Sequence, residues 1–211
     1  MPTITFQFLL EHLGIAVSAT TGVLAARGRR IDLFGVLVLA LVTSFGGGTI
    51  RDLLVGDLPV AWLREPSYLI NASLTAMIVF FLARKRRFAS RSLVWADACA
   101  LALFVVIGTR KGLSLNFSPT VCVLLGVTTG VVGGILRDVL TREVPLVFQP
   151  EIRLYATAAL VGAAVQVSLH YLGIADSIAG LSGGAVVLAM RVAGIFWRLA
   201  LPEFESDTPH P

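Results

Sequence analysis

The chain has 211 residues, of which 56% are hydrophobic and only 14% are charged. Its mean hydropathy of +0.84 lies outside the usual range of soluble domains, so the composition predicts an integral membrane protein. The net charge of +4 comes from short basic clusters between apolar runs, and no recognition motif accompanies it. We therefore expect membrane-topology loops and no nucleic-acid partner.

Apolar runs between charge and proline boundaries predict seven transmembrane helices and no soluble domain, since each span needs about 20 residues. The predicted spans cover residues 6–26, 31–54, 66–83, 92–109, 118–140, 152–172 and 175–198. This all-α pattern divides into four parts: a first three-helix repeat (1–90), a second, inverted repeat (91–172), a seventh helix (173–200) and a disordered cytoplasmic tail (201–211).

Basic residues are distributed unequally between the two sides of these spans. Eleven follow spans one, three, five and seven, whereas three lie on the opposite side. The positive-inside rule then predicts an extracytoplasmic N-terminus and a cytoplasmic C-terminus in the cell's inner (plasma) membrane.

An internal repeat appears when the sequence is shifted by 86 residues. The shift aligns two copies of the string G-G-x-x-R-D-x-L-x-x-x-x-P, one beginning at Gly47 and the other at Gly133. Each copy belongs to a unit of three spans, and because three is odd, the second unit enters the membrane from the opposite side. The sequence therefore predicts two inverted repeats, an architecture common among transport proteins.

Consecutive glycines interrupt the second and fifth predicted spans: Gly46, Gly47 and Gly48 in one, Gly133 and Gly134 in the other. Each glycine weakens a helix by about 1 kcal/mol relative to alanine, which favours a kink or an unwound turn. Irregular backbone at membrane depth is tolerated only where it is buried in protein or lines a watered cavity. We therefore expect a pore between the repeats; the alternative is that the glycines only permit close helix packing.

An arginine–aspartate pair follows each glycine run: Arg51 with Asp52, and Arg137 with Asp138. An unpaired charge at this depth costs about 3 kcal/mol or more. Helical neighbours point about 100° apart, so we expect each charge to find a partner elsewhere. One symmetric arrangement joins Arg51 to Asp138 and Arg137 to Asp52; the alternatives are opposite mouths, an interhelical brace or lipid-headgroup contacts.

Hydroxyl groups on the same two spans are candidate pore-lining ligands, although a membrane threonine often bonds its own backbone instead. They are Thr43, Ser44, Thr49, Thr128 and Thr129.

Two acids occupy equivalent positions near the starts of spans one and four, Glu11 and Asp97. They are candidates to attract cations at the two pore mouths, and the alternative is a favourable interaction with the helix dipole. No catalytic set, nucleotide-binding loop or metal-ligand cluster accompanies them, so we expect no enzyme activity, cofactor or resident metal.

With its paired GGGTIRD and VGGILRD segments, the chain resembles the prokaryotic branch of the trimeric intracellular cation (TRIC) channel family from about residue 6 to 198. The resemblance implies a homotrimer with one pore per protomer, kinked second and fifth helices, and conduction of monovalent cations, chiefly potassium. It carries over to the glycines and to the arginine–aspartate pairs named above. Val132 departs from a triple glycine, which implies a stiffer second hinge.

Two other functions stay open at this point. Relatives with the same doubled domain are also labelled putative glycine transporters, so a secondary carrier of a small zwitterion is the alternative. A third is a membrane scaffold that binds lipid headgroups through its arginines. The expected partners are a second and third copy of the chain, membrane lipids and permeant K⁺ or Na⁺.

Overall fold

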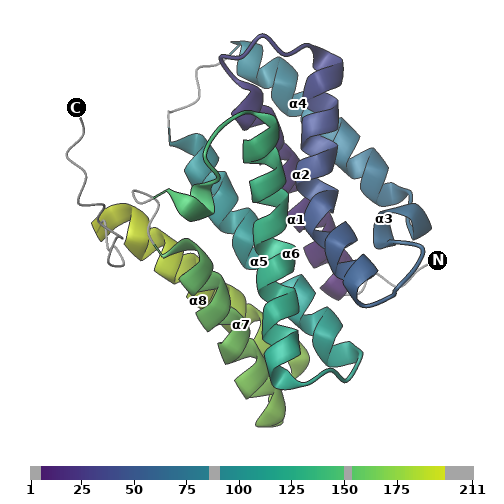
Figure 1. Ribbon diagram of the computed structural model, residues 1–211, viewed down its shortest axis with the longest axis vertical. Helices are drawn as coiled ribbons and strands as arrows, with labels where there is room; N and C mark the ends of the chain where they lie inside the picture. The colour runs from purple at the N-terminus through teal and green to yellow at the C-terminus, as the bar shows by residue number, and fades with distance from the viewer. Residues whose placement is uncertain (1–5, 86–90, 150–153, 198–211) are drawn as a thin grey trace, which may run out of the picture.

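The computed structural model describes residues 6–85, 91–149 and 154–197, and every regular element in these ranges is a helix (Figure 1). The elements are α1 (Phe6–Ala26), α2 (Leu33–Leu54), α3 (Ala61–Arg64), α4 (Ser67–Lys85), α5 (Ser92–Ser114), α6 (Pro119–Leu140), a 3-10 turn η1 (Leu146–Phe148), α7 (Tyr155–Tyr171) and α8 (Asp176–Trp197). The all-α prediction is confirmed. The predicted tail at 201–211 lies outside the described residues.

The long helices form a bundle of membrane-spanning dimensions. Of the described helices, α1, α2, α4, α5, α6 and α8 are long and apolar enough to cross a membrane. The helix α7 has 17 residues and falls below that length, so the seventh span stays a prediction. Large side chains such as Phe34, Ile70 and Leu181 are more than half exposed, as lipid-facing positions require.

Contacts at the helix ends show that the bundle has two distinct faces. On the first face, the His12 ring lies 3.2 Å from the Ser67 hydroxyl, which joins the start of α1 to the start of α4. Lys111 pairs with Asp57 on the same face and joins the end of α5 to the loop after α2. The first three-helix unit therefore begins on the face where α5, the first helix of the second unit, ends.

The second face gathers the opposite ends. Arg29, which follows α1, pairs with Glu143, which follows α6. The rings of Trp95 and Phe196 lie 5.5 Å apart and join the start of α5 to the end of α8. Because α5 starts here while α1 starts on the first face, the two units are inverted, as the odd number of spans predicts.

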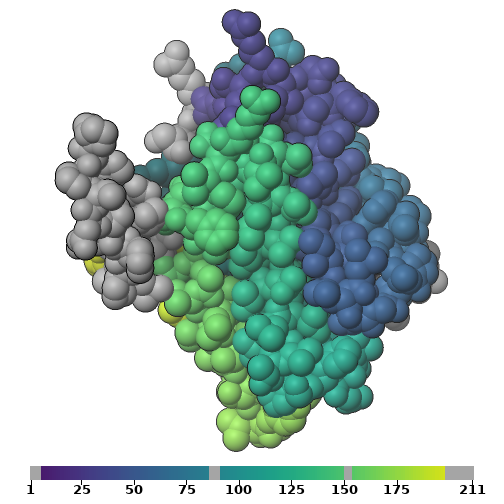
Figure 2. Space-filling view, in the orientation of Figure 1, coloured from purple at the N-terminus to yellow at the C-terminus, as the bar shows by residue number. Residues whose placement is uncertain are grey.

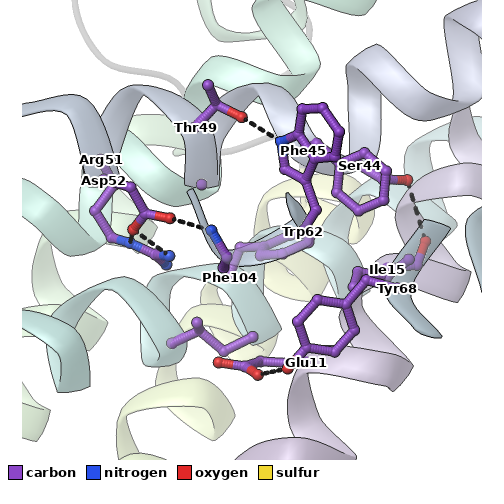
Figure 3. Close-up of a pocket in the computed structure, with 13 residues that line it drawn as sticks. Glu11, Ile15, Ser44, Phe45, Thr49, Arg51, Asp52, Trp62, Tyr68 and Phe104 are labelled. Carbon is purple, nitrogen blue, oxygen red and sulfur yellow. Dashed lines mark hydrogen bonds and ion pairs between the residues drawn. The ribbon is translucent and has the colours of Figure 1, made fainter. Parts of the chain in front are cut away.

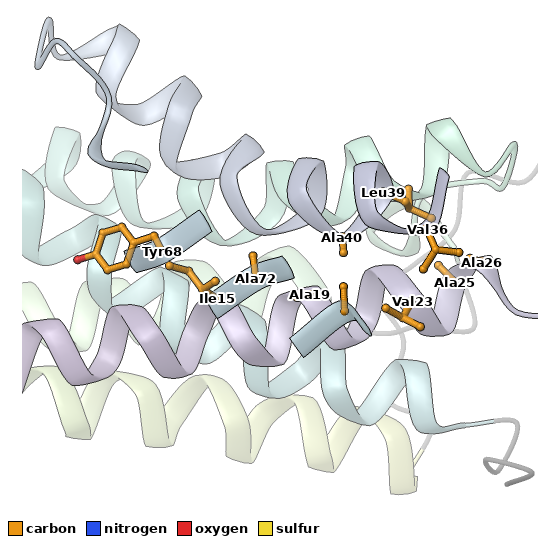
Figure 4. Packing of buried hydrophobic residues seen from close by; sticks show 11 residues of the cluster. Ile15, Ala19, Val23, Ala25, Ala26, Val36, Leu39, Ala40, Tyr68 and Ala72 are labelled. Atoms are coloured by element: carbon orange, nitrogen blue, oxygen red, sulfur yellow. The ribbon is translucent and has the colours of Figure 1, made fainter. Parts of the chain in front are cut away.

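Each unit has its own apolar core, built largely from small side chains. In the first unit, Ala19, Ala40 and Ala72 from α1, α2 and α4 belong to this core and are at most 1% exposed, and Ala19 faces Ala40 (Figure 4). In the second unit, Ala158 and Ala163 of α7 are equally buried. Small residues let the helix backbones approach closely, which supplies the van der Waals packing that associates helices in lipid.

The glycine runs of α2 and α6 do not unwind, so of the two expected outcomes, a kink or an unwound turn, the unwound turn is wrong. Both helices are continuous α-helix through these positions. A Cβ added at Gly47 would lie 2.1 Å from the Thr129 carbonyl oxygen, and one at Gly133 would lie 2.4 Å from the Thr43 carbonyl oxygen. The four residues are repeat equivalents, so the contact is reciprocal. Close packing therefore explains these two glycines. Both helices keep their backbone hydrogen bonds, which an unwound turn in lipid would lose.

These backbone contacts place α2 and α6 directly beside each other along the bundle. Figure 2 shows α6, coloured teal to green, running along the visible surface next to α2, coloured blue. The glycines thus act at a helix interface that joins the two repeats.

Adjacent glycines of α2 provide a matched test of this packing. We expect Gly47→Ala to destabilise the protein by about 1–3 kcal/mol or more, because the new methyl group meets backbone that cannot turn aside. Gly48→Ala should be neutral or stabilising by up to about 1 kcal/mol, because its Cβ would meet only the end of the Arg51 side chain, at 3.8 Å. Thermal unfolding of the purified protein in detergent measures both. Equal effects of the two substitutions would contradict the close-contact assignment.

Candidate functional site

Two cavities lined by both polar and apolar side chains adjoin each other inside the bundle. The first cavity, of about 40 Å³, is large enough to hold water. It opens among α1, α2, α3, α4 and α5 (Figure 3). Its lining combines acids, hydroxyls and aromatic rings: Glu11, Ile15, Ser44, Phe45, Gly48, Thr49, Arg51, Asp52, Ala61, Trp62, Tyr68, Phe104 and Ile107.

In the first cavity, the side chains of Arg51 and Asp52 bind each other. Nε and Nη2 of Arg51 donate to Oδ1 of Asp52 at 2.9 and 2.8 Å. Oδ2 of Asp52 accepts a hydrogen bond from the Ala61 amide at 3.0 Å, which fixes the start of α3. Both side chains are buried, so this pairing neutralises two charges that would otherwise be costly.

Glu11 is the acid that approaches this pair from α1. Its carboxylate accepts hydrogen bonds from the Tyr68 hydroxyl and, at 3.0 Å, from the Gln7 amide. Figure 3 shows the Tyr68 ring pointing at Glu11 across the cavity from Asp52. Glu11 is partly buried and lines the first cavity, and its role as a mouth acid stays a prediction.

The second cavity lies deeper, between the repeats, and its volume of about 10 Å³ is that of roughly one water molecule. Helices α1, α2, α5 and α6 line it with Ser18, Thr21, Thr43, Ser44, Gly47, Asp97, Ala100, Leu101, Phe104, Thr129, Gly130, Gly133, Gly134 and Arg137. It shares Ser44 and Phe104 with the first cavity, so these two residues separate one from the other.

Arg137 is the central cation of the second repeat and is 0% exposed. Its Nη1 donates to Asp97 at 2.8 Å, while Nε and Nη2 donate to Asp138 at 2.8 and 3.1 Å. Oδ2 of Asp138 also accepts from the Leu146 amide at 2.9 Å, which fixes the start of η1. Asp97 is therefore a buried partner of Arg137 and does not lie at an open mouth, which differs from our expectation.

The pairing of these charges corrects the expectation that each charge would find its partner elsewhere and not at its neighbour in sequence; the symmetric arrangement of Arg51 with Asp138 and Arg137 with Asp52 does not occur. Each arginine binds the aspartate next to it in sequence. The Cβ atoms of neighbours do diverge, but the long arginine side chain folds along the helix until its guanidinium reaches the adjacent carboxylate. The aspartates in turn fasten the short turns that follow α2 and α6.

Most of the predicted site residues do meet at these cavities. Thirteen of them line one or both: Glu11, Thr43, Ser44, Gly47, Gly48, Thr49, Arg51, Asp52, Asp97, Thr129, Gly133, Gly134 and Arg137. The predicted residues Gly46, Thr128 and Asp138 are not among the described residues that line either cavity. Sequence reasoning missed Ser18, Thr21 and Phe104, whose only signal was their place on the helices that carry Glu11 or Asp97.

Ion pairs between the repeats hold both faces of the bundle. Asp57 and Glu143 are equivalent at the 86-residue offset, and each follows a glycine-bearing helix. Asp57 binds Lys111 of the second repeat, and Glu143 binds Arg29 of the first. Hydrogen bonds from Arg64, at 2.7 Å, and from Lys111 lower the pKa of Asp57 from 3.8 to about 2. Asp57 thus stays ionised at any physiological pH.

The low pKa of Asp57 predicts a pH-dependent contribution to stability. Since the folded-state pKa lies below the ordinary value, the contribution is complete above about pH 4 and is lost as the pH falls towards about 2. We expect Asp57→Asn to destabilise the protein by about 0.5–1 kcal/mol at neutral pH and low salt, and less at high salt. Thermal unfolding at several pH values measures this effect.

The control for this experiment is Glu65→Gln, which removes an exposed acid from the same face that contacts the Ser67 amide at 3.4 Å. The prediction is wrong if both variants show the same pH and salt dependence as the unmodified protein.

Together, the fold and the cavities define a polytopic α-helical membrane protein with two inverted repeats and two internal cavities. A family model described as Glycine transporter matches residues 8–84 and 94–171. The inner membrane protein YadS of Escherichia coli K12, of the group UPF0126, is 43% identical over 95% of this chain and 97% of its own length. The chain therefore belongs to this family of doubled membrane domains.

Solved structures connect this family to the channels that the motif resembles. The TRIC trimeric intracellular cation channel orthologue from Rhodobacter sphaeroides shares 39% identity and a TM-score of 0.86, over 92% of this chain and 98% of that one. A prokaryotic TRIC channel crystallised in 0.5 M KCl shares 28% identity and a TM-score of 0.84, over 94% and 100% of the two chains. The resemblance to the TRIC family is thus confirmed.

Proposed function

We propose that this protein is a monovalent cation channel whose conduction path runs through the two cavities of each protomer. The observation that carries the proposal is that the two cavities adjoin: the first cavity contains Glu11, the second contains Asp97, and Ser44 and Phe104 belong to both. Acids at two levels of a polar path attract cations, while the paired arginines are already neutralised by neighbouring carboxylates.

The relatives support the same class of function. The solved neighbours are named as cation channels, and the Rhodobacter sphaeroides orthologue is named as trimeric. We infer that this chain also forms a homotrimer with one path per protomer, and that potassium is its main permeant ion. The first face is extracytoplasmic and the second cytoplasmic, since Arg27, Arg29 and Lys85 lie at the second face.

Phe104 is an apolar residue that lines both cavities of the proposed path. It separates the two cavities, and its ring also lies 3.5 Å from the Cβ position of Gly14 on α1. An apolar side chain across a polar path impedes hydrated ions, which is one means by which channels close. We infer that ions pass when Phe104 moves away from Ser44.

The path is tested by filling the first cavity from α2. We expect Gly48→Leu to reduce potassium flux into proteoliposomes by tenfold or more, because the leucine side chain would enter a cavity of about 40 Å³. The control is Val38→Leu, which places the same leucine side chain at an exposed position of the same helix. Flux is read from a potassium-sensitive dye, and assembly of each variant is checked by size-exclusion chromatography.

The outcomes separate the main alternatives. Flux in assembled Gly48→Leu equal to that of Val38→Leu would exclude this path. No flux in the unmodified protein, together with saturable counterflow of labelled glycine, would replace the channel with a carrier.

Phe104 gives an independent prediction in the opposite direction. We expect Phe104→Ala to raise potassium flux severalfold, because the truncation joins the two cavities. The control Phe34→Ala removes a ring that is 72% exposed on the outside of α2 and should leave flux unchanged. A fall in flux through a correctly assembled Phe104→Ala protein would show that this ring does not obstruct the path.

A further inference from the structure

A lateral groove of about 370 Å³ lies between α1, α5 and α8, at residues 10–17, 99–106 and 180–188. Among the described residues, it shares no lining residue with either internal cavity. Leu13 of α1 and Leu181 of α8 line the groove and are 54% and 57% exposed, so it opens on the outside of the bundle. In a membrane, such a surface contacts either lipid or another protein.

The lining of this lateral groove fits hydrocarbon and not water. Its lining residues are all alanine, cysteine, glycine, leucine or valine, so none of them has a hydroxyl, amide or charged side chain. A bound water molecule needs about two to four polar partners, which these side chains do not offer. An empty groove would leave the lining without dispersion contacts on one side. Hydrocarbon, from an acyl chain or from apolar side chains of another protein, is therefore what fills it.

The lateral groove lies in the half of the bundle nearer the first face. Helix α1 begins at that face, and its groove residues lie within positions 10–17. Helix α8 ends at the second face, where the rings of Trp95 and Phe196 lie 5.5 Å apart, and its groove residues lie within positions 180–188. An acyl chain in the groove therefore belongs to a lipid whose headgroup lies at the first face.

Arg110 provides a cation at the first-face end of the groove. It follows Val106, which lines the groove, by four residues, so the two lie on the same face of α5, about 6 Å apart along the axis. Arg110 is partly exposed and has no hydrogen bond or ion pair to another described residue. Its neighbour Lys111 differs, because Lys111 pairs with Asp57. An arginine without an acidic partner at the membrane surface attracts anionic headgroups.

The start of α8 borders the same end of the groove. Ser177 lies three residues before Gly180, which lines the groove, and therefore on the same face of α8. Ser177 is exposed, and a serine hydroxyl donates hydrogen bonds to oxygen atoms. Asp176, the acid beside it, contacts His170 at 2.7 Å. A guanidinium and a hydroxyl thus lie at one end of an apolar groove, and both groups bind phosphate oxygens.

We propose that the lateral groove binds one acyl chain of an anionic phospholipid, with the phosphate against Arg110 and Ser177. The other occupant to consider is an apolar surface of a second copy of the chain, but such a surface offers Arg110 no anion. Charge complementarity therefore favours the lipid. Among the described residues, the groove and the proposed ion path have no lining residue in common, so this inference does not depend on the channel.

Native mass spectrometry of the protein in detergent counts the bound lipids and gives the oligomeric mass. The probe is phosphatidylglycerol with palmitoyl and oleoyl chains, added at rising concentration. We expect saturable binding with a stoichiometry of one lipid per protomer. Diacylglycerol with the same chains lacks the phosphate and should bind at least about fivefold more weakly. Equal affinities for the two lipids would overturn the proposal.

Matched arginine variants test the headgroup site. Arg110→Gln removes the cation beside the groove and should weaken phosphatidylglycerol binding about fivefold. The control is Arg64→Gln, which removes an arginine of the same face that pairs with Asp57 instead. The control protein should bind the lipid normally. Equal affinities of the two variants would contradict the placement of the phosphate at Arg110.

Matched tryptophan variants test the acyl-chain site. Ala185 and Ala189 are both exposed on α8, but only Ala185 is among the described residues that line the groove. We expect Ala185→Trp to weaken lipid binding by about tenfold or more, because the ring fills the groove, and Ala189→Trp to have little effect. Equal lipid binding by the two variants would refute the acyl-chain site. Loss of the oligomer in Ala185→Trp, with lipid binding unchanged, would assign the groove to a second copy instead.

Discussion

The structure depends on a reciprocal backbone contact between α2 and α6. Gly47 packs on the Thr129 carbonyl, and its equivalent Gly133 packs on the Thr43 carbonyl. Lipid gives no hydrophobic force that draws helices together, so close van der Waals approach has to supply the attraction between the repeats. The same approach brings the hydroxyls of both helices to one small cavity. A packing constraint thus also determines where the polar groups can meet.

The charged groups follow from this packing. With α2 and α6 in backbone contact, the aspartates at their ends are buried and need partners within reach. Asp52 and Asp138 each bind the preceding arginine and the amide of a returning turn, so one carboxylate both neutralises a charge and positions a loop. These clusters therefore belong to the fold as well as to the site. Removing one aspartate would take away both the partner of its arginine and the acceptor that holds the returning turn.

The sequence predicted the parts of this arrangement that a repeat and an apolar pattern encode. The all-α fold, the inversion and most cavity residues follow from the 86-residue offset and the glycine runs. What sequence could not reveal was the direction of a long side chain: helix geometry separates the Cβ atoms of Arg51 and Asp52 but does not limit the guanidinium. Nor could it show that Gly47 and Gly133 allow close backbone contact without an unwound turn, because both uses of a glycine need the same missing Cβ.

The two repeats share a fold, but different side chains line the cavity beside each of them. Ser18 and Phe104 are equivalent at the 86-residue offset, yet one offers an oxygen to the second cavity and the other separates the cavities with a ring. Glu11 binds a tyrosine at the wider cavity, whereas Asp97 is held by a guanidinium at the narrow one. A symmetric dimer of repeats would place identical barriers at both levels. Divergence at a few lining positions instead makes the two cavities unequal, about 40 Å³ beside Glu11 and about 10 Å³ beside Asp97.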